Sequence, residues 1–213
     1  MQVTVFGATG YTGRHLLAEL LERGHSVVAV SRSAATGLPD GVRVVAGDIH
    51  DPAVVDDATP GSQAILVAVG AIDEGGRHLV EAVPALVGAA AAEGARLGVV
   101  GNAGSLSREA GGPRVYDEPD FPADWKPGSL ALTEVLDTLR STGDGVDWFF
   151  LSPPLGYGSY APGEKRGVYR TGGDEIVADA DGRSFISGPD FATAMVDELE
   201  RPAHRRTRFT VGY

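Results

Sequence analysis

The chain has 213 residues, which suits a single α/β domain that is large enough to bury most of its apolar surface. It contains no cysteine, which excludes disulfides, thiolate nucleophiles and cysteine-based metal sites. Its formal net charge of -11 at pH 7 would repel a nucleic-acid backbone, so we expect no nucleic-acid partner.

The amino-terminal residues MQVTVFGATG carry no basic segment before an apolar core and no cleavage site. No apolar run approaches the roughly 18 residues that a membrane span requires. We therefore expect a soluble, unprocessed, cytoplasmic protein without a membrane partner. No feature of the sequence indicates an oligomeric state.

Short runs of β-branched residues alternate with longer stretches of helical period, which is typical of βαβ units around a parallel sheet. Nearly every run is apolar throughout, as expected for strands that helices cover on both faces. The strands are expected at Gln2–Phe6, Ser26–Val30, Val42–Ala46, Ala64–Val69, Leu97–Val100, Trp148–Leu151 and Arg208–Val211. The pattern predicts a single doubly wound α/β domain over residues 1–213.

The helices of this domain are expected at Thr12–Arg23, Pro52–Ala58, Leu79–Ala95, Pro127–Ser141 and Asp190–Glu200. In the third of them, Pro84 should kink the chain or mark the true first turn.

Two regions, residues 104–128 and 153–184, break the alternation and are rich in Gly, Pro and aromatic residues. Each follows the carboxyl end of a predicted strand, and in an open parallel sheet this is the edge where ligands bind. We expect the two regions to form a substrate pocket, as a small substrate-loop part of the single domain. The alternative for each region is a floppy surface loop.

The segment GATGYTG follows the first predicted strand and opens the first predicted helix, a context typical of a dinucleotide site. Gly7 would permit the tight turn, Gly10 would let the backbone approach a pyrophosphate, and Gly13 would allow close packing of helix and strand. The N–H groups from Thr9 to Thr12 and the positive helix end would face the anion. The alternative is a purely structural turn.

The end of the second predicted strand reads VVAVSRSA and has no carboxylate, although an NAD site usually has one there for the ribose hydroxyls. Arg32, between Ser31 and Ser33, suits a 2′-phosphate because its guanidinium is a planar fork of donors. We therefore expect NADP(H) to be preferred, with NAD(H) as the other cofactor. The alternative for Arg32 is a solvated loop arginine.

The segment AGDIHD follows the third predicted strand. Asp48 could accept from the adenine amino group while Ile49 covers the ring, or Asp48 could cap the helix that begins at Pro52. His50 is interpreted as a surface loop residue. The five histidines are scattered without metal-ligand spacing, so no metal is expected.

The segments VFGATGYTGRHLLAELLERGHSVVAVSRS, GDIHD and VVGNAGSL together resemble the atypical short-chain dehydrogenase/reductase superfamily. More narrowly, they are similar to its NAD(P)H-binding group related to flavin reductase/biliverdin reductase B and to nitrogen-metabolite-repressor-like proteins. DWFFLSPP and ISGPDFATAMVDELERPAHRRTRFTVGY extend the resemblance over nearly the whole chain. It implies a Rossmann-type fold and a nicotinamide dinucleotide.

The same resemblance implies which residues bind the cofactor. It places the pyrophosphate at Gly7, Thr9, Gly10, Tyr11 and Thr12, and the 2′-phosphate at Arg32. It places the adenine at Asp48 and Ile49, and the adenine-side ribose and diphosphate at Val69, Gly70 and Ala71. The nicotinamide end is expected at residues 101–104 and 152–155, which include Gly101, Asn102, Ala103, Pro153, Pro154 and Leu155.

Standard members of the superfamily carry Tyr-x-x-x-Lys at the helix after the fifth strand, but DWKPGSLALTEVLDTLR has no such pair. The remaining catalytic candidates are Ser105, which could donate to a substrate carbonyl or cap a turn, and Tyr157. Tyr116 and Tyr160 are further loop tyrosines, and packing is the alternative for each of the three tyrosines.

Hydride transfer to a flavin or quinone needs little acid-base help, because the acceptor is an electron sink. The sequence therefore favours an NADP(H)-dependent reductase of a small planar acceptor. The alternatives are a non-catalytic dinucleotide sensor that binds a protein partner and, less favoured, an epimerase or dehydratase.

Overall fold

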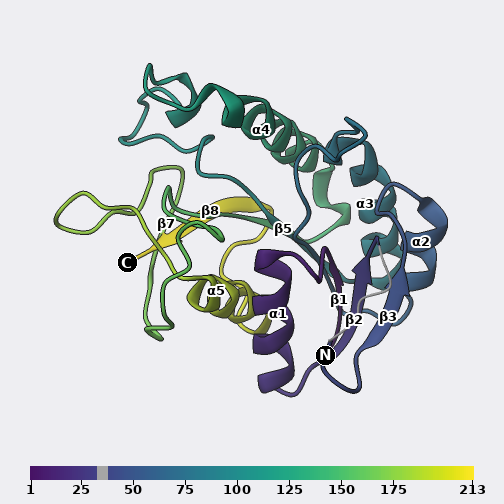
Figure 1. Ribbon diagram of the computed structural model, residues 1–213. Coiled ribbons are helices and arrows are strands. Elements are labelled where there is room, and N and C mark those ends of the chain that lie inside the picture. Colours follow the sequence, from purple (N-terminus) through teal and green to yellow (C-terminus); the bar gives the residue numbers. More distant parts are fainter. Residues whose placement is uncertain (33–37) are drawn as a thin grey trace.

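The computed structural model describes residues 1–32 and 38–213. Within these ranges, the strands form one sheet in the order β3-β2-β1-β4-β5-β6-β8-β7, and helices cover both of its faces (Figure 1). The strands are β1 (Gln2–Phe6), β2 (Ser26–Ser31), β3 (Arg43–Ala46), β4 (Ala64–Val67), β5 (Arg96–Val100), β6 (Trp148–Ser152), β7 (Arg170–Gly172) and β8 (Thr207–Gly212). The α-helices are α1 (Tyr11–Glu22), α2 (Pro52–Ala58), α3 (Val83–Glu93), α4 (Lys126–Arg140) and α5 (Gly188–Glu200). Short 3-10 helices are η1 (Leu79–Ala82), η2 (Val115–Asp117), η3 (Ala123–Trp125) and η4 (Gly143–Gly145).

Strand β1 lies inside the sheet and pairs in parallel with β2 on one side and with β4 on the other. The chain runs outward from β1 to β3 and then crosses back over β1 to begin β4. At such a reversal of strand order, a crevice opens at the carboxyl ends of the strands. The fold therefore brings the turns after β1, β2, β3 and β4 to one edge of the sheet.

Two apolar clusters hold the layers together, because successive residues of a strand point to opposite faces. Val3 and Val5 of β1 belong to the cluster under α1 and α5, which lie side by side in Figure 1. Phe6 belongs to the other cluster, which α2, α3 and α4 cover. The inner strands are buried on both faces, which agrees with their mainly apolar sequences.

The predicted doubly wound α/β fold is confirmed, and each predicted strand ends within two residues of an observed one. The predicted helix Leu79–Ala95 is divided into η1 and α3. Pro84 is the second residue of α3, so it marks the true first turn of that helix. In the described parts of the chain, no helix is long and apolar enough to cross a membrane.

Strand β7 lies in the second irregular region and was not predicted. It is a polar segment of three residues, and Thr171 pairs with Val211 of β8 in antiparallel register. Both irregular regions contain backbone hydrogen bonds and meet at Ser107, whose N–H donates to the Asp174 carbonyl at 3.0 Å. The Ser107 carbonyl in turn accepts from Ile176 at 2.9 Å.

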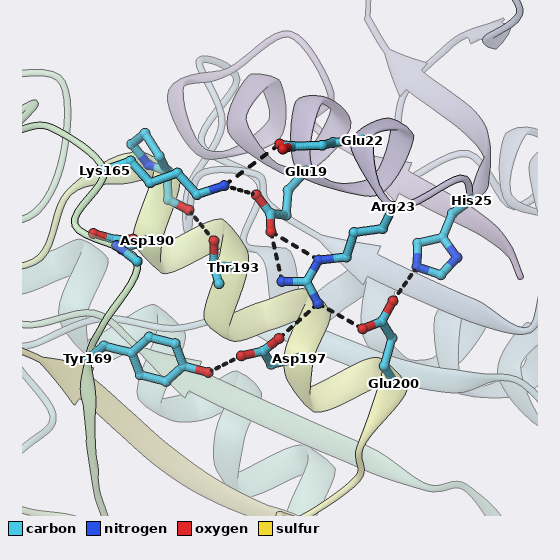
Figure 2. A network of polar contacts seen from close by, with 12 residues as sticks. Glu19, Glu22, Arg23, His25, Lys165, Tyr169, Asp190, Thr193, Asp197 and Glu200 are labelled. Carbon is cyan, nitrogen blue, oxygen red and sulfur yellow. Dashed lines mark hydrogen bonds and ion pairs between the residues drawn. The ribbon is translucent and has the colours of Figure 1, made fainter.

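Polar contacts also join the second irregular region to α1 and α5 (Figure 2). Lys165 Nζ lies 2.8 Å from Glu19 Oε2 of α1. The Tyr169 hydroxyl donates to Asp197 of α5 at 2.6 Å, and Arg23, the C-cap residue of α1, donates to the same carboxylate at 2.8 Å. These contacts fix the loop that follows β6 against the helical layer.

Candidate functional site

Two cavities lie along the carboxyl edge of the sheet. The first, about 350 Å³, is bounded by the segments that follow β1, β2, β3 and β4. The second, about 450 Å³, is bounded by the segments that follow β5 and β6 and by the start of α4. Gly7, Thr9 and Gly10 line the first cavity, whereas Tyr11 and Thr12 line the second. The amino-terminal end of α1 therefore lies between the two cavities.

The turn between β1 and α1 requires glycine at two positions. Gly7 has a φ of +80°, and a Cβ there would lie 2.3 Å from the Ala68 carbonyl oxygen. A Cβ at Gly13 would lie 2.0 Å from the Gly7 carbonyl oxygen. The glycines thus let the helix start against the sheet edge and leave the backbone uncovered beside the first cavity.

The first turn of α1 suits an anion. Gly10 is its N-cap residue, so no side chain caps the helix, and the structure shows no acidic residue in the first turn of this fully described helix. Its first N–H groups lack intrahelical acceptors and carry the positive end of the helix dipole. This arrangement binds phosphate groups in many proteins.

Arg32 stands at the end of β2, and its side chain lines the first cavity. This side chain is 62% exposed, and its Nη2 lies 3.5 Å from Oε1 of Glu74, which follows β4. Ser33, which the sequence places beside Arg32, lies outside the described residues. Arg32 is thus positioned at the rim of the cavity, opposite a carboxylate.

Asp48 lies beside Ile49 in the wall of the first cavity, and its carboxylate has partners within the protein. The His50 backbone N–H donates to Asp48 Oδ1 at 2.9 Å, and the Arg77 guanidinium donates to Oδ2. The backbone and side chain of His50, together with Arg77, lower the pKa of Asp48 to about 2. Asp48 does not cap α2, because Asp51 Oδ1 accepts from the Ala53 N–H at 2.9 Å. The helix-cap alternative was therefore wrong.

His50 is not the surface residue that the sequence suggested, because its side chain is only 9% exposed. Its Nδ1 lies 3.0 Å from Asp48 Oδ1, and its Nε2 lies 3.1 Å from the His78 carbonyl oxygen. Asp48, His50 and Asp73 are close enough together to offer ligand atoms to one metal ion. Arg77 already supplies a positive charge between the two carboxylates, with its Nη2 at 2.7 Å from Asp73 Oδ2.

The second cavity brings α4 next to the segment that follows β5. Asn102 joins the two, because its Oδ1 accepts from the Ser105 N–H at 2.7 Å and its Nδ2 donates to the Ser129 carbonyl at 3.3 Å. At the mouth of the cavity, Trp125 and Tyr160 lie with their ring centroids 5.8 Å apart. They are 52% and 63% exposed, so flat aromatic surface faces solvent there.

Tyr157 lies in the wall of the second cavity and contacts the start of α1. Its hydroxyl is 2.8 Å from Thr12 Oγ1, and its ring centroid is 4.4 Å from that of Phe191. Burial raises the pKa of Tyr157, so the phenol is neutral near pH 7. The hydroxyl can therefore act as a donor toward Thr12 or toward a ligand.

Ser105 does not reach the second cavity. Its side chain is buried, with 1% of the residue exposed, and its Oγ accepts from Arg208 Nη1 at 3.0 Å. The Arg208 guanidinium also donates to the Ser105 carbonyl at 2.9 Å. This placement gives no support to donation to a substrate, and it shows the hydroxyl paired with Arg208 in place of the turn cap that was the alternative.

Most of the expected cofactor residues line the two cavities. The first cavity is lined by Gly7, Thr9, Gly10, Arg32, Asp48, Ile49, Val69 and Gly70. The second cavity is lined by Tyr11, Thr12, Gly101, Asn102, Ala103, Pro153, Pro154 and Leu155. Ala71 lines neither cavity. The sequence reasoning missed Trp125 and Ser129, although the segment DWKPGS at a predicted helix start beside the sheet edge was a signal for both.

The chain was compared with known proteins. The pattern of the NAD(P)H-binding family matches residues 7–202. The Bacillus subtilis protein YwnB, which is uncharacterised, is 38% identical over 214 residues, with 99% of this chain and 98% of that protein covered.

Two solved structures are also similar over the full length of this chain. A Streptococcus pneumoniae protein with the provisional name NADH-flavin reductase is 30% identical, with a TM-score of 0.86 and 99% of that chain covered. A Bacteroides thetaiotaomicron protein with the provisional name epimerase is 32% identical, with a TM-score of 0.85 and 96% of that chain covered. These findings confirm the resemblance that the sequence indicated. The chain belongs to the NAD(P)H-binding family, within the group of Rossmann-type proteins similar to atypical short-chain dehydrogenases/reductases.

Proposed function

We propose that this protein is an NAD(P)H-dependent oxidoreductase that transfers hydride to a small planar acceptor such as a flavin or a quinone. The observation that carries the proposal is the pair of cavities on either side of the amino terminus of α1. The first suits the adenosine half of a dinucleotide, and the second suits the nicotinamide together with a second molecule. The provisional name of the Streptococcus pneumoniae relative supports the same class of reaction.

The residues of the first cavity fit a dinucleotide, because the glycine turn leaves room for a diphosphate beside the free N–H groups of α1. The guanidinium of Arg32 would bind a 2′-phosphate and so favours NADP(H). Pro153 and Pro154, at the end of β6, would hold the nicotinamide end in place. The bound nicotinamide supplies the hydride.

The second cavity supports a planar acceptor. Trp125 and Tyr160 offer aromatic faces at its mouth, and such faces stack on flat conjugated rings. A flavin or quinone takes up the hydride electrons itself, and solvent can supply the proton. This chemistry needs no Tyr/Lys pair.

The test uses purified protein with NADPH or NADH and a panel of flavins and quinones. We expect oxidation of the reduced cofactor, followed by its absorbance, above the rate without protein for at least one acceptor. Absence of turnover with the whole panel, at cofactor concentrations shown by calorimetry to saturate the protein, would overturn the reductase proposal.

A second candidate is a non-catalytic dinucleotide sensor. It is supported by the placement of Ser105, a predicted catalytic residue whose hydroxyl contacts Arg208 inside the protein and which lines neither cavity. This candidate predicts cofactor binding without turnover and a protein partner that distinguishes NADP+ from NADPH. Epimerase or dehydratase chemistry has less support, since it needs a proton-transfer group that Ser105 does not provide.

A cytoplasmic location stays a prediction, which cell fractionation would test.

A further inference from the structure

The rim of the first cavity carries a pair of opposite charges. Arg32, at the end of β2, and Glu74, in the turn after β4, come from strands on opposite sides of β1. Their side chains lie 3.5 Å apart and are 62% and 89% exposed. Because the pair is open to solvent, breaking it costs little free energy, and either residue can then contact a ligand.

The other carboxylates of this cavity already have a cation. Among the described lining residues, Arg32 carries the one permanent positive charge, whereas Asp48, Asp73 and Glu74 carry carboxylates. Arg77, behind the wall, pairs with both Asp48 and Asp73. Glu74 is therefore the carboxylate whose charge Arg32 balances.

The backbone of Glu74 is held in place by its neighbour. Asp73 Oδ1 accepts from the Gly75 N–H at 2.8 Å and from the Arg77 N–H at 2.9 Å. The Asp73 carbonyl also accepts from the Gly76 N–H at 3.0 Å. This closed turn holds the Glu74 backbone at the rim, so that the side chain is within reach of Arg32.

We infer that Glu74 is a specificity-determining residue, which opposes the 2′-phosphate that Arg32 attracts and lets the protein use NADH as well as NADPH. The inference rests on the proposed function. A 2′-phosphate that binds Arg32 displaces Glu74 from its ion pair and meets a like charge within a few ångströms. A free ribose hydroxyl can instead donate to the Glu74 carboxylate, as it does to the acidic residue of NAD sites.

The experiment is calorimetric titration of the full chain with NADPH and with NADH, on wild type, Glu74→Gln, Arg32→Ala and the double variant. Glu74→Gln should raise the ratio of NADPH affinity to NADH affinity about fivefold, the effect of one unit charge near 4 Å in water. Arg32→Ala should lower that ratio. In the Arg32→Ala background the Glu74→Gln effect should be smaller, since the two residues contact each other.

Glu164→Gln is the matched control, because it removes the same charge from an exposed glutamate that lines neither cavity. It should leave the ratio unchanged. Raising the salt concentration to about 1 M should shrink the Glu74→Gln effect, because exposed charges are then screened within about 3 Å.

The outcomes separate the inference from the proposed function. Equal ratios for wild type and Glu74→Gln, with both cofactors bound, would overturn the role of Glu74 and leave the dinucleotide site intact. A rise in the ratio of NADPH affinity to NADH affinity in Glu164→Gln equal to that in Glu74→Gln would also overturn the role of Glu74, because the rise would then follow from net charge alone. Failure of wild type to bind either cofactor would overturn the proposed function and the inference together.

Discussion

Two glycines in helices, Gly13 and Gly88, differ in whether the structure has room for a side chain at their positions. Gly13, in the first turn of α1, has the Gly7 carbonyl oxygen 2.0 Å from its ideal Cβ position. Gly88, in α3, has nothing within 4 Å of that position. The same substitution at the two positions should therefore act in opposite directions.

We expect Gly13→Ala to destabilise the protein by about 3 kcal/mol, because the backbone of the turn must move to admit a methyl group. Gly88→Ala should stabilise it by about 0.5 to 1 kcal/mol, since alanine favours a helix. Urea unfolding measures both changes, and calorimetry should show weaker NADPH binding for Gly13→Ala alone. Equal effects of the two substitutions would contradict the close packing at Gly13.

At the scale of elements, local sequence patterns predicted most of the fold but fewer of the site contacts. Gly7, Thr9, Gly10, Tyr11 and Thr12 line the two cavities. The backbone geometry of this turn depends on residues that are neighbours in the sequence, so the motif could be recognised from the sequence alone. The side chain of Ser105 is directed by Arg208, which lies 103 residues away along the chain. Strand β7 has only three residues, none of them a large apolar residue, and it forms by pairing with the edge of β8. No periodicity within such a segment could reveal it.

The start of α4 gives a prediction about the acceptor. Trp125 and Leu130 are both exposed apolar residues, at 52% and 46%, but Trp125 lines the second cavity and Leu130 does not. Trp125→Ala should raise the KM for the planar acceptor about tenfold, the effect of losing roughly 1.4 kcal/mol of stacking and burial. The Kd for NADPH should stay unchanged. Steady-state kinetics and calorimetry measure the two quantities, and an equal rise in KM for Leu130→Ala would argue against stacking at Trp125.

At the scale of the whole molecule, the two cavities depend on different parts of the chain. The first is lined by the turns after β1 to β4, which are close in sequence to their strands. The second also needs the two irregular regions, and their position depends on contacts with α1, α5 and β8. Under the proposed function, specificity for the acceptor would therefore rest on long-range packing, whereas dinucleotide binding would rest on turns that lie next to their strands in the sequence.

Asp190 is central to that packing, because it joins the second irregular region, α5 and the end of the chain. It is fully buried and accepts from the backbone N–H groups of Arg166 and Gly167, at 2.7 and 2.9 Å. The hydroxyls of Ser187 and Tyr213 also donate to it. Although burial acts in the opposite sense, these donors lower the pKa of Asp190 below its ordinary value of 3.8.

A carboxyl group whose pKa is lower in the folded protein than in the unfolded chain stabilises the fold. The full contribution is present at pH values above the ordinary pKa, and it is lost as the pH falls through the lower pKa of the folded state. Near neutral pH, Asp190→Asn should lower the free energy of unfolding by about 2 to 4 kcal/mol, because an amide cannot accept from all of these donors. The difference from wild type should shrink as the pH falls below the ordinary carboxyl pKa of 3.8, because the carboxylate takes up a proton first in the unfolded chain and then in the folded protein. Urea unfolding across this range measures it, with Asp181→Asn, whose side chain is 80% exposed, as the control. A deficit that stays constant down to the lowest pH would contradict a stabilising role for the ionised Asp190.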